Sequence, residues 1–383
     1  MIEVQRISDY NQFLAIHPKW EKLFIESNST NFFLSWEWSD AYLSSQAFPQ
    51  EEPWIIMVYQ GTRLIGVAPL ARSTIHKNNL KFSILTQIAK MQCDTGCFLM
   101  LPEIEDIFLE SLFSYLAEHR HEWDFFEMNE VSLHENFGEK IKKFYPQKHI
   151  LLVTRDIQHE LPLKKNWDEY FIILSKKTQF NYRRYTRLLS EIGLISDKLY
   201  YKEVIPAGVM ENIRDIRRHG SYPDFYDSPA YFEFISQLLT KNVPVGNAYI
   251  NLTLIDDKPI AFSFGFVKAG LITFWQGTYN KAYAKFSAGF INDAATIRIS
   301  MEDPKFSAEN LKRGSFLRGG QNYKSVFKSE KEIYEVFRVV KPSLKTFFGI
   351  LLPLYLKRMF GKNKSEFGTY KYDIYKSCKI AEE

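Results

Sequence analysis

The same order of secondary-structure elements can be traced in both halves of this 383-residue sequence, and this repetition constrains the fold more than any single motif. In each half, apolar periodicity and β-rich runs predict two helices, a hairpin, a strand, a helix and a last strand. In the first half we predict helices near residues 20–24, 36–44 and 104–119, and strands at 54–60, 64–70, 82–88, 125–131 and 150–154. In the second half we predict one long helix from Asn166 to about residue 192, helices at 209–218, 229–239 and 288–301, and strands at 248–255, 260–267, 271–277, 315–317 and 334–339.

This order of elements predicts the fold class. Three antiparallel strands followed by a helix and a fourth strand form a layered α+β plan. We therefore predict an α+β protein of two tandem domains, each with a mixed, mostly antiparallel sheet flanked by helices, and the length suits two domains. The predicted N-terminal domain covers residues 1–158, the C-terminal domain residues 159–340, and a basic, apolar tail residues 341–383.

Charge and cysteine content exclude several classes of protein. The net charge is +4, but residues 336–383 alone carry ten Lys/Arg and four Asp/Glu, so the first 335 residues are slightly acidic. A DNA-binding protein needs a concentrated basic face, which argues against DNA as a partner. Three cysteines, Cys93, Cys97 and Cys378, form no secreted disulfide framework, and no histidine near the first two suggests a metal site. The polar N-terminus does not resemble a signal peptide, and we expect a cytoplasmic protein.

Several short motifs, in this order, resemble a known family. The stretches are FLSWEW at 33–38, the hairpin at 61–69, LSKK through NYRR at 174–184, KPIA at 258–261, residues 279–289, and GG through YK at 319–324. Together they resemble the GNAT-like acetyltransferases of the CelD/BcsL type, tied to bacterial cellulose and exopolysaccharide synthesis. That family looks related to the Fem aminoacyl-transferases, which also pair two GNAT-like domains. Gln179 departs from a basic position of the family pattern, and Asn280 and Gln321 from acidic ones.

The resemblance implies an acyltransferase and leaves two alternatives open. It implies transfer of an acyl group from acetyl-CoA or another acyl-CoA, used as a co-substrate, to a small-molecule or saccharide acceptor such as a cell-envelope or exopolysaccharide precursor. No permanently bound cofactor is expected. One alternative is a non-catalytic scaffold of a polysaccharide-synthesis complex. The other is a Fem-like transferase that uses aminoacyl-tRNA, which the near-neutral body disfavours.

The turn at residues 285–289 is the predicted donor site. Lys285, Phe286, Ser287, Ala288 and Gly289 follow a strand and open a helix, where backbone N–H groups and the helix dipole attract phosphate. The resemblance assigns this turn to the pyrophosphate of acyl-CoA. The alternative is an ordinary helix start with Ser287 as its cap.

Three further residues are predicted to bind substrate. Helical spacing places Asn181 in an apolar row, where its amide requires a partner from the substrate or the backbone. Arg183 belongs to a basic run at 176–187 that would face an anionic substrate or simply solvent. Trp275, on the predicted strand at 271–277, completes the set.

Three residues are candidates for positioning or proton transfer. His219 ends a predicted helix, a place that suits either a cap or a general base. Tyr279 and Lys324 lie in the motifs that carry the resemblance. Each of the three also has a purely structural interpretation. The acceptor must lose a proton when it attacks a thioester, so a proton acceptor is required.

The tail combines an apolar run at 347–356 with flanking lysines and arginines. Ten residues are too few to span a bilayer, which needs about 20. Basic residues beside an apolar segment suit the surface of an anionic membrane. The tail therefore predicts either peripheral association with the inner face of the membrane or a helix docked on the protein.

Overall fold

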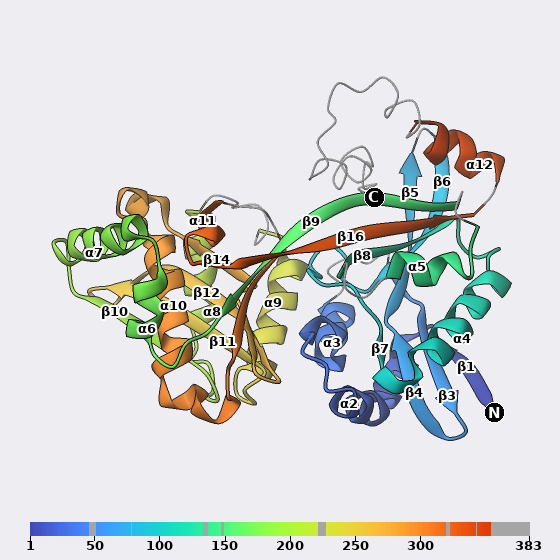
Figure 1. The fold of residues 1–383 in the computed structure, drawn as a ribbon, viewed down its shortest axis with the longest axis horizontal. Helices are drawn as coiled ribbons and strands as arrows, with labels where there is room; N and C mark the ends of the chain where they lie inside the picture. Colours follow the sequence, from blue (N-terminus) through green and yellow to red (C-terminus); the bar gives the residue numbers. More distant parts are fainter. Residues whose placement is uncertain are drawn as a thin grey trace.

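Two long strands, β9 (Ile150–Pro162) and β16 (Glu330–Val340), run side by side through both halves of the molecule (Figure 1). The computed structural model describes residues 1–45, 51–77, 79–132, 137–146, 149–220, 227–318, 322–341 and 343–353. The predicted boundary at residues 158/159 falls inside β9, so a shared ribbon of strands joins the two halves.

The first half contains the predicted helices and strands. Its helices are α1 (Tyr10–Ala15), α2 (His17–Glu26), η1 (Phe32–Leu34), α3 (Trp36–Ser45), η2 (Pro102–Ile104), α4 (Glu105–Glu118) and α5 (Phe137–Lys142). Its strands are β1 (Ile2–Ile7), β2 (Glu52–Pro53), β3 (Ile55–Gln60), β4 (Arg63–Ala68), β5 (Leu70–Lys77), β6 (Leu80–Gln87), β7 (Leu99–Met100) and β8 (Phe125–Ser132).

The second half repeats the order. Its helices are α6 (Trp167–Ile173), α7 (Lys176–Ser190), α8 (Val209–Arg218), α9 (Pro229–Asn242), η6 (Lys281–Phe286), α10 (Ala288–Glu302), η7 (Pro304–Glu309) and α11 (Asn322–Ser325). Its strands are β10 (Ile195–Tyr200), β11 (Ala248–Ile255), β12 (Lys258–Lys268), β13 (Leu271–Thr273), β14 (Gln276–Tyr279) and β15 (Arg313–Arg318). A last helical segment comprises α12 (Leu344–Thr346) and η8 (Phe347–Leu351).

The sheets confirm the predicted fold class. Strands β1, β3, β4 and β7 form a small antiparallel sheet, and the large sheet has the order β10-β11-β12-β13-β15-β9-β16-β8-β6-β5-β2, with β14 on β12. All pairs are antiparallel except β13–β15 and β6–β8. Because β9 and β16 connect the two ends of this path, the predicted sheets of the two halves are hydrogen-bonded to each other.

Two predicted elements are interrupted in the structure. The long helix after Asn166 breaks at Leu174, whose extended backbone ends α6, and Ser175 then caps α7 through the N–H of Thr178. Asn166 caps α6 as predicted, by accepting from the N–H of Glu169. The predicted strand at 271–277 is split into β13 and β14, and this split shapes the candidate site.

The largest core cluster contains residues of both halves. Trp38 of α3 packs edge to face on Phe234 of α9 and on Trp275, at ring-centre distances of 5.3 and 5.1 Å. Phe32 stacks on Phe266 of β12 at 4.1 Å. These rings are all at most 9% exposed, so separating the halves would expose a large aromatic surface.

Candidate active site

Strands β13 and β15 run parallel and then separate. Thr273 is opposite Ser315, and the N–H of Phe274 still donates to Ser315 O at 2.7 Å, but β14 afterwards pairs with β12. Gly265 of β12 makes the break possible, because a Cβ there would lie 1.8 Å from Thr273 O. On the other side, Leu317 has φ +53° within a register shift of β15. As a result, β14 pairs with β12 and diverges from the end of β15.

Lys324 fixes the end of β15. Its ammonium donates to the carbonyl oxygens of Phe316, Leu317 and Arg318 at 2.8, 3.4 and 2.5 Å. The three N–H groups of the Lys324 ammonium thus each have a carbonyl acceptor, and Lys324 is 4% exposed. Burial lowers the pKa of Lys324 to about 8 against nearby carboxylates, which include Asp94. In this structure Lys324, which we predicted to be catalytic, holds the bent end of β15 in place.

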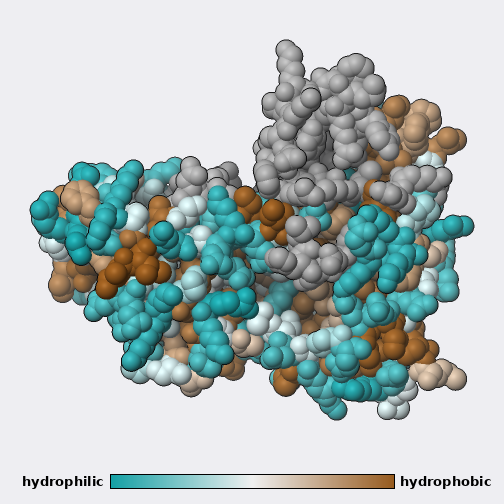
Figure 2. Space-filling view, viewed as in Figure 1, coloured by the Kyte–Doolittle hydropathy of each residue, from teal (hydrophilic) through white to brown (hydrophobic). Residues whose placement is uncertain are grey.

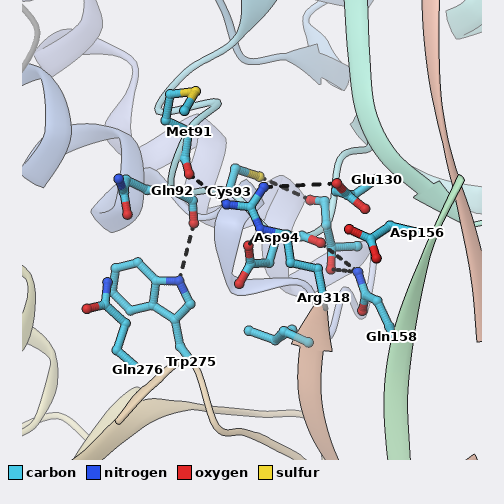
Figure 3. A network of polar contacts seen from close by, with 12 residues as sticks. Met91, Gln92, Cys93, Asp94, Glu130, Asp156, Gln158, Trp275, Gln276 and Arg318 are labelled. Atoms are coloured by element: carbon cyan, nitrogen blue, oxygen red, sulfur yellow. Dashed lines mark hydrogen bonds and ion pairs between the residues drawn. The ribbon is translucent and has the colours of Figure 1, made fainter. Parts of the chain in front are cut away.

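A segment of the first half, residues 91–95, contacts Trp275, between β13 and β14, and Arg318, at the end of β15 (Figure 3). Trp275 Nε1 donates to Gln92 O at 3.2 Å, and Arg318 donates to Met91 O at 2.8 Å and forms an ion pair with Asp94. Trp275, predicted to bind substrate, is thus a buried contact between the halves. The segment carried no local signal except Cys93, so sequence reasoning did not identify Asp94 or Arg318.

The predicted donor turn stands at the far end of β14. By helix geometry, the N–H groups of Ala288, Gly289 and Phe290 have no acceptor within α10, and Ile291 is the first to bond back, to Ser287 O. Ser287 adopts the left-handed conformation at φ +53° and makes no side-chain cap, so the alternative of a serine cap is wrong. Three N–H groups at this helix start remain available for an anion.

Two lysines flank the turn. Lys281 and Lys285 are exposed, and no ion pair engages either of them within the described part of the chain. Lys285 Nζ lies 4.8 Å above the ring of Phe286, which is itself 8% exposed and anchors the turn in the core. The turn therefore joins a buried aromatic anchor to two cations that are free to meet phosphate.

Gly289 lies under the ring of Tyr279. A Cβ at Gly289 would lie 2.7 Å from Cδ1 of Tyr279, so the phenol ring of Tyr279 packs directly over this helix start. Tyr279 is half-buried and close to the predicted anion site. The absence of a side chain at Gly289 thus makes room for Tyr279.

His219 also lies beside the turn. Its backbone carbonyl accepts from the N–H of Lys281 at 3.0 Å. The imidazole is exposed, with Nδ1 2.9 Å from Asp215 O and 3.5 Å from Asp215 Oδ1, on the preceding turn of α8. The structure therefore brings His219 and Tyr279 to the predicted donor turn but places Lys324 at the end of β15.

The predicted residues on α7 lie near the same turn. α7 packs on η6 and α10, and Tyr182 shares a cluster with Tyr279. Asn181 is half-buried, without a hydrogen bond to its side chain among the described residues, and Arg183 is exposed with its guanidinium over the ring of Phe171. Gln179 is the buried amide of this helix and donates to Leu174 O at 2.9 Å.

Asp293 is a titratable group that the sequence analysis did not consider. It follows Gly289 by four residues on α10, which places both on one face of the helix, and it is half-buried. Burial raises the pKa of Asp293 to about 7, and the Lys324 ammonium opposes this rise. Tyr249 is the other titratable neighbour, and its hydroxyl donates to Thr273 O at the strand break.

A cavity of about 540 Å³ opens elsewhere between the halves. Its lining includes Phe32, Thr95, Glu160, Leu271 and Arg313, and none of the predicted site residues. It extends along β13 and β15 to Thr273 and Ser315, where these strands begin to separate, whereas the donor turn follows β14. Among the described residues, no group of three His, Cys, Asp or Glu side chains is placed to hold a metal ion.

Comparisons with known proteins bear on the fold and on one part of the chain. Residues 176–325 match the family model described as Acetyltransferase (GNAT) domain, and no curated protein matches the sequence. FemX has a TM-score of 0.57 at 9% identity, over 93% of this chain and 99% of that chain. The C-terminal domain (DUF2156) of a lysylphosphatidylglycerol synthetase from Agrobacterium fabrum, so described, has a TM-score of 0.52 at 7% identity, over 93% and 100%. A conserved protein of unknown function from Bacteroides thetaiotaomicron has a TM-score of 0.50 at 11% identity, over 89% and 100%. At these identities the likeness concerns the fold.

Proposed function

We propose that this chain is an acyltransferase that moves an acyl group from acyl-CoA to a hydroxyl or amine of a cell-envelope or exopolysaccharide precursor. The match of residues 176–325 to the acetyltransferase (GNAT) domain supports this proposal. The observation that carries the proposal is the helix start of α10, with three N–H groups and two unpaired lysines beside the separated strands β14 and β15. This arrangement suits the pyrophosphate of acyl-CoA at the start of α10.

Donor binding rests on Lys281, Lys285 and the N–H groups of residues 288–290. Both lysines are exposed, so each acts as a point charge near the diphosphate and contributes most at low salt. The N–H groups of α10 give the binding its direction because they are fixed by the helix. The ring of Tyr279 packs over Gly289 and so borders the proposed donor site on the side of the sheet.

Transfer requires a proton acceptor. The acceptor oxygen or nitrogen attacks the thioester carbonyl, its proton passes to a base, the C–S bond breaks, and the CoA thiolate takes up a proton. In our proposal Asp293 is the base, because it lies one helical turn beyond the donor turn and its pKa of about 7 suits exchange at neutral pH. His219 and Tyr279 position the reactants, and Lys324 maintains the bend of β15.

Two alternatives remain distinct from this proposal. A non-catalytic scaffold of a polysaccharide-synthesis complex would keep the fold and bind no donor. A Fem-like transferase would use aminoacyl-tRNA, which is supported by the likeness to FemX but disfavoured by the slightly acidic charge of residues 1–335. We favour acyl-CoA because two lysines and a helix start match one pyrophosphate better than a long phosphate backbone.

Calorimetric titration separates these possibilities. Acetyl-CoA or a longer acyl-CoA should bind the full-length protein, while sugar nucleotides report on the acceptor. In Lys281→Ala/Lys285→Ala we expect a loss of acyl-CoA affinity of about tenfold at low salt, smaller at high salt, because two exposed charges are removed. Lys312→Ala, an exposed lysine away from the turn, is the matched control and should bind as the wild type does. Absence of binding by every acyl-CoA would favour the scaffold.

A further inference from the structure

The cavity between the halves has one face of the large sheet as its floor. Residues that lie opposite each other on neighbouring strands point to the same side of a sheet. Thr273 of β13 is opposite Ser315 of β15, and Ser315 is opposite Glu160 of β9. Gln158, two residues before Glu160 and therefore on the same side, is opposite Glu332 of β16. All five residues line the cavity, whose volume of about 540 Å³ is in the range of small-molecule sites.

The first half supplies the opposite wall. The loop at residues 27–34, between α2 and α3, lines the cavity, and Asn31 of this loop donates to Thr95 O at 3.1 Å. Phe32 stacks on Phe266 of β12 at a ring-centre distance of 4.1 Å, and both rings belong to the lining. In the view of Figure 2 the described hydrophobic side chains lie in separate patches, so aromatic rings from both halves gather in the cavity and not on this face.

Carboxylates outnumber cations around this cavity. Its lining, all of which the structure describes, contains Glu105, Glu160 and Glu332, with Arg313 as the only lysine or arginine. Glu105 forms an ion pair with Lys140, which lies outside the lining. Arg313 donates to Glu160 Oε2 at 3.1 Å, and in the described part of the chain nothing donates to Glu160 Oε1. Burial raises the pKa of Glu160, Arg313 opposes this rise and Glu332 adds to it. The floor therefore repels anions and offers a carboxylate oxygen to a cation.

Two serine hydroxyl groups of the lining can donate hydrogen bonds to a ligand. Ser315 Oγ accepts from the N–H of Leu317 at 3.1 Å, and Ser29 Oγ accepts from the N–H of Asn31 at 3.2 Å. Among the described residues, neither serine has an acceptor for its own O–H. Ser315 is 2% exposed, and a buried O–H ordinarily has a partner. A ligand with hydroxyl oxygens would supply one.

We propose that this cavity binds a saccharide that carries an amine. Its ammonium group lies at Glu160 and Glu332, and its hydroxyl groups accept hydrogen bonds from Ser29 and Ser315. The apolar C–H face of the sugar ring packs on the ring of Phe32. Sugar phosphates and sugar nucleotides are excluded, because their negative charge would meet the carboxylates of the floor.

This inference deepens the proposed function, on which it rests only for the role of the saccharide as acceptor. The cavity extends to Thr273 and Ser315, where β13 and β15 begin to separate, within the matched residues 176–325. In the transfer the ammonium group loses a proton, its nitrogen bonds to the thioester carbon, and the C–S bond breaks. The products are the amide, the CoA thiol and one released proton. The acceptor group is therefore an amine.

Calorimetric titration of the full-length protein with four ligands tests the proposal. The probes are a glucosamine disaccharide, cellobiose as the matched disaccharide without an amine, spermidine as a cation without a sugar ring, and UDP-glucose as a phosphate-bearing sugar. The glucosamine disaccharide should bind about tenfold or more tightly than cellobiose or spermidine, and UDP-glucose should not displace it. Equal affinity for spermidine or cellobiose, or displacement by UDP-glucose, would overturn the proposal.

Variants of the lining locate the ligand. Glu160→Gln/Glu332→Gln should lower the affinity for the glucosamine disaccharide about tenfold and leave that for cellobiose unchanged. Glu203→Gln is the matched control, because Glu203 is an exposed carboxylate paired with Lys305 outside the lining, and it should bind as the wild type does. If the double variant fails to fold, Ser29→Ala in its loop should still lower the affinity for both disaccharides at an unchanged melting temperature. Wild-type affinity in Ser29→Ala, or in a folded double variant, would contradict the site.

The donor variant Lys281→Ala/Lys285→Ala separates this inference from the proposed function. Both lysines are outside the lining of the cavity, so this variant should bind the glucosamine disaccharide with the wild-type affinity. A wild type that binds the disaccharide but no acyl-CoA would refute the proposed function and leave the cavity site intact. A wild type that binds acyl-CoA but no glucosamine disaccharide would refute the cavity site alone.

Discussion

At the scale of single residues, Asp293 is the group whose chemistry depends most on its surroundings. An ordinary aspartate is fully ionised at neutral pH, but burial raises the pKa of this one to about 7. Lys324 and Tyr249 are the titratable groups that influence it, and Lys324 is itself held by backbone carbonyls. The ammonium therefore stays at a fixed place while the carboxyl group exchanges its proton.

For the variant Asp293→Asn we expect a large loss of turnover, about 100-fold or more, with little change in acyl-CoA affinity. In the wild type, the rate should rise with pH through about 7 as the carboxyl group loses its proton, and the variant should lack this rise. The measurement is the pH dependence of turnover. Asp197→Asn, which removes a buried aspartate bound by Thr253 and Arg298, should keep the wild-type profile.

Stability gives an independent readout for the same residue. Because the pKa of Asp293 is higher in the folded than in the unfolded protein, its stabilising contribution is present below about pH 4 and is lost as the pH rises through about 7. At pH 8, Asp293→Asn should therefore melt no lower than the wild type. A marked fall in melting temperature at that pH would indicate a structural role and argue against a base.

At the scale of elements, a buried network of charges ties the segment before Asp94 to the sheet. Lys90, in the loop after β6, and Arg338, on β16, both form ion pairs with Glu127 of β8. All three side chains are at most 7% exposed. Despite burial, these two cations lower the pKa of Glu127 to about 2. The network fixes the start of the segment whose other end contacts Trp275 and Arg318.

The variant Glu127→Gln should lose about 3–5 kcal/mol of unfolding free energy, because Lys90 and Arg338 would stay buried without a counter-charge. Urea unfolding at pH 7 measures this loss. The surface pair of Glu26 and Arg63 is the control, and Glu26→Gln should cost much less unfolding free energy, because solvent screens an exposed pair. In the wild type, the contribution of Glu127 is present above about pH 4.5 and is lost as the pH falls toward 2. Equal costs for the two variants would contradict the network.

At the scale of the whole molecule, the two halves share both a sheet and a core. Strands β9 and β16 link β15 of the second half to β8 of the first, and the aromatic rings of Trp38, Phe234 and Trp275 pack across the junction. The ribbon in Figure 1 therefore joins the halves covalently and through hydrogen bonds. The large sheet and the largest core cluster both contain residues of the two halves, so neither half alone would form them.

Unfolding should consequently be a single cooperative transition. Scanning calorimetry of the full-length protein should give one peak, with calorimetric and van't Hoff enthalpies in agreement. Trp275→Ala, which creates a cavity at the junction and removes the bond to Gln92, should shift this peak to lower temperature without splitting it. Two resolved peaks in the wild type would mean that the halves unfold independently.

The sequence alone determined the local elements and their order. Helices α4, α8 and α9, the hairpin of β11 and β12, and the cap at Asn166 follow from periodicity, turns and side-chain chemistry within a few residues. The turn before α10 was also located, because the start of a helix depends on the backbone of neighbouring residues. Such features are encoded locally and can be predicted from a short window.

Only the tertiary structure decided how these elements form a site. Arg318 bonds to Met91, 227 residues earlier in the chain, and Trp275 bonds to Gln92, 183 residues earlier. The break between β13 and β14 depends on the close approach of Gly265 to Thr273. The contacts of Lys324 with backbone carbonyls depend on the bend at Leu317. No local pattern records which distant backbone a side chain will meet, because these contacts arise from packing the two halves together.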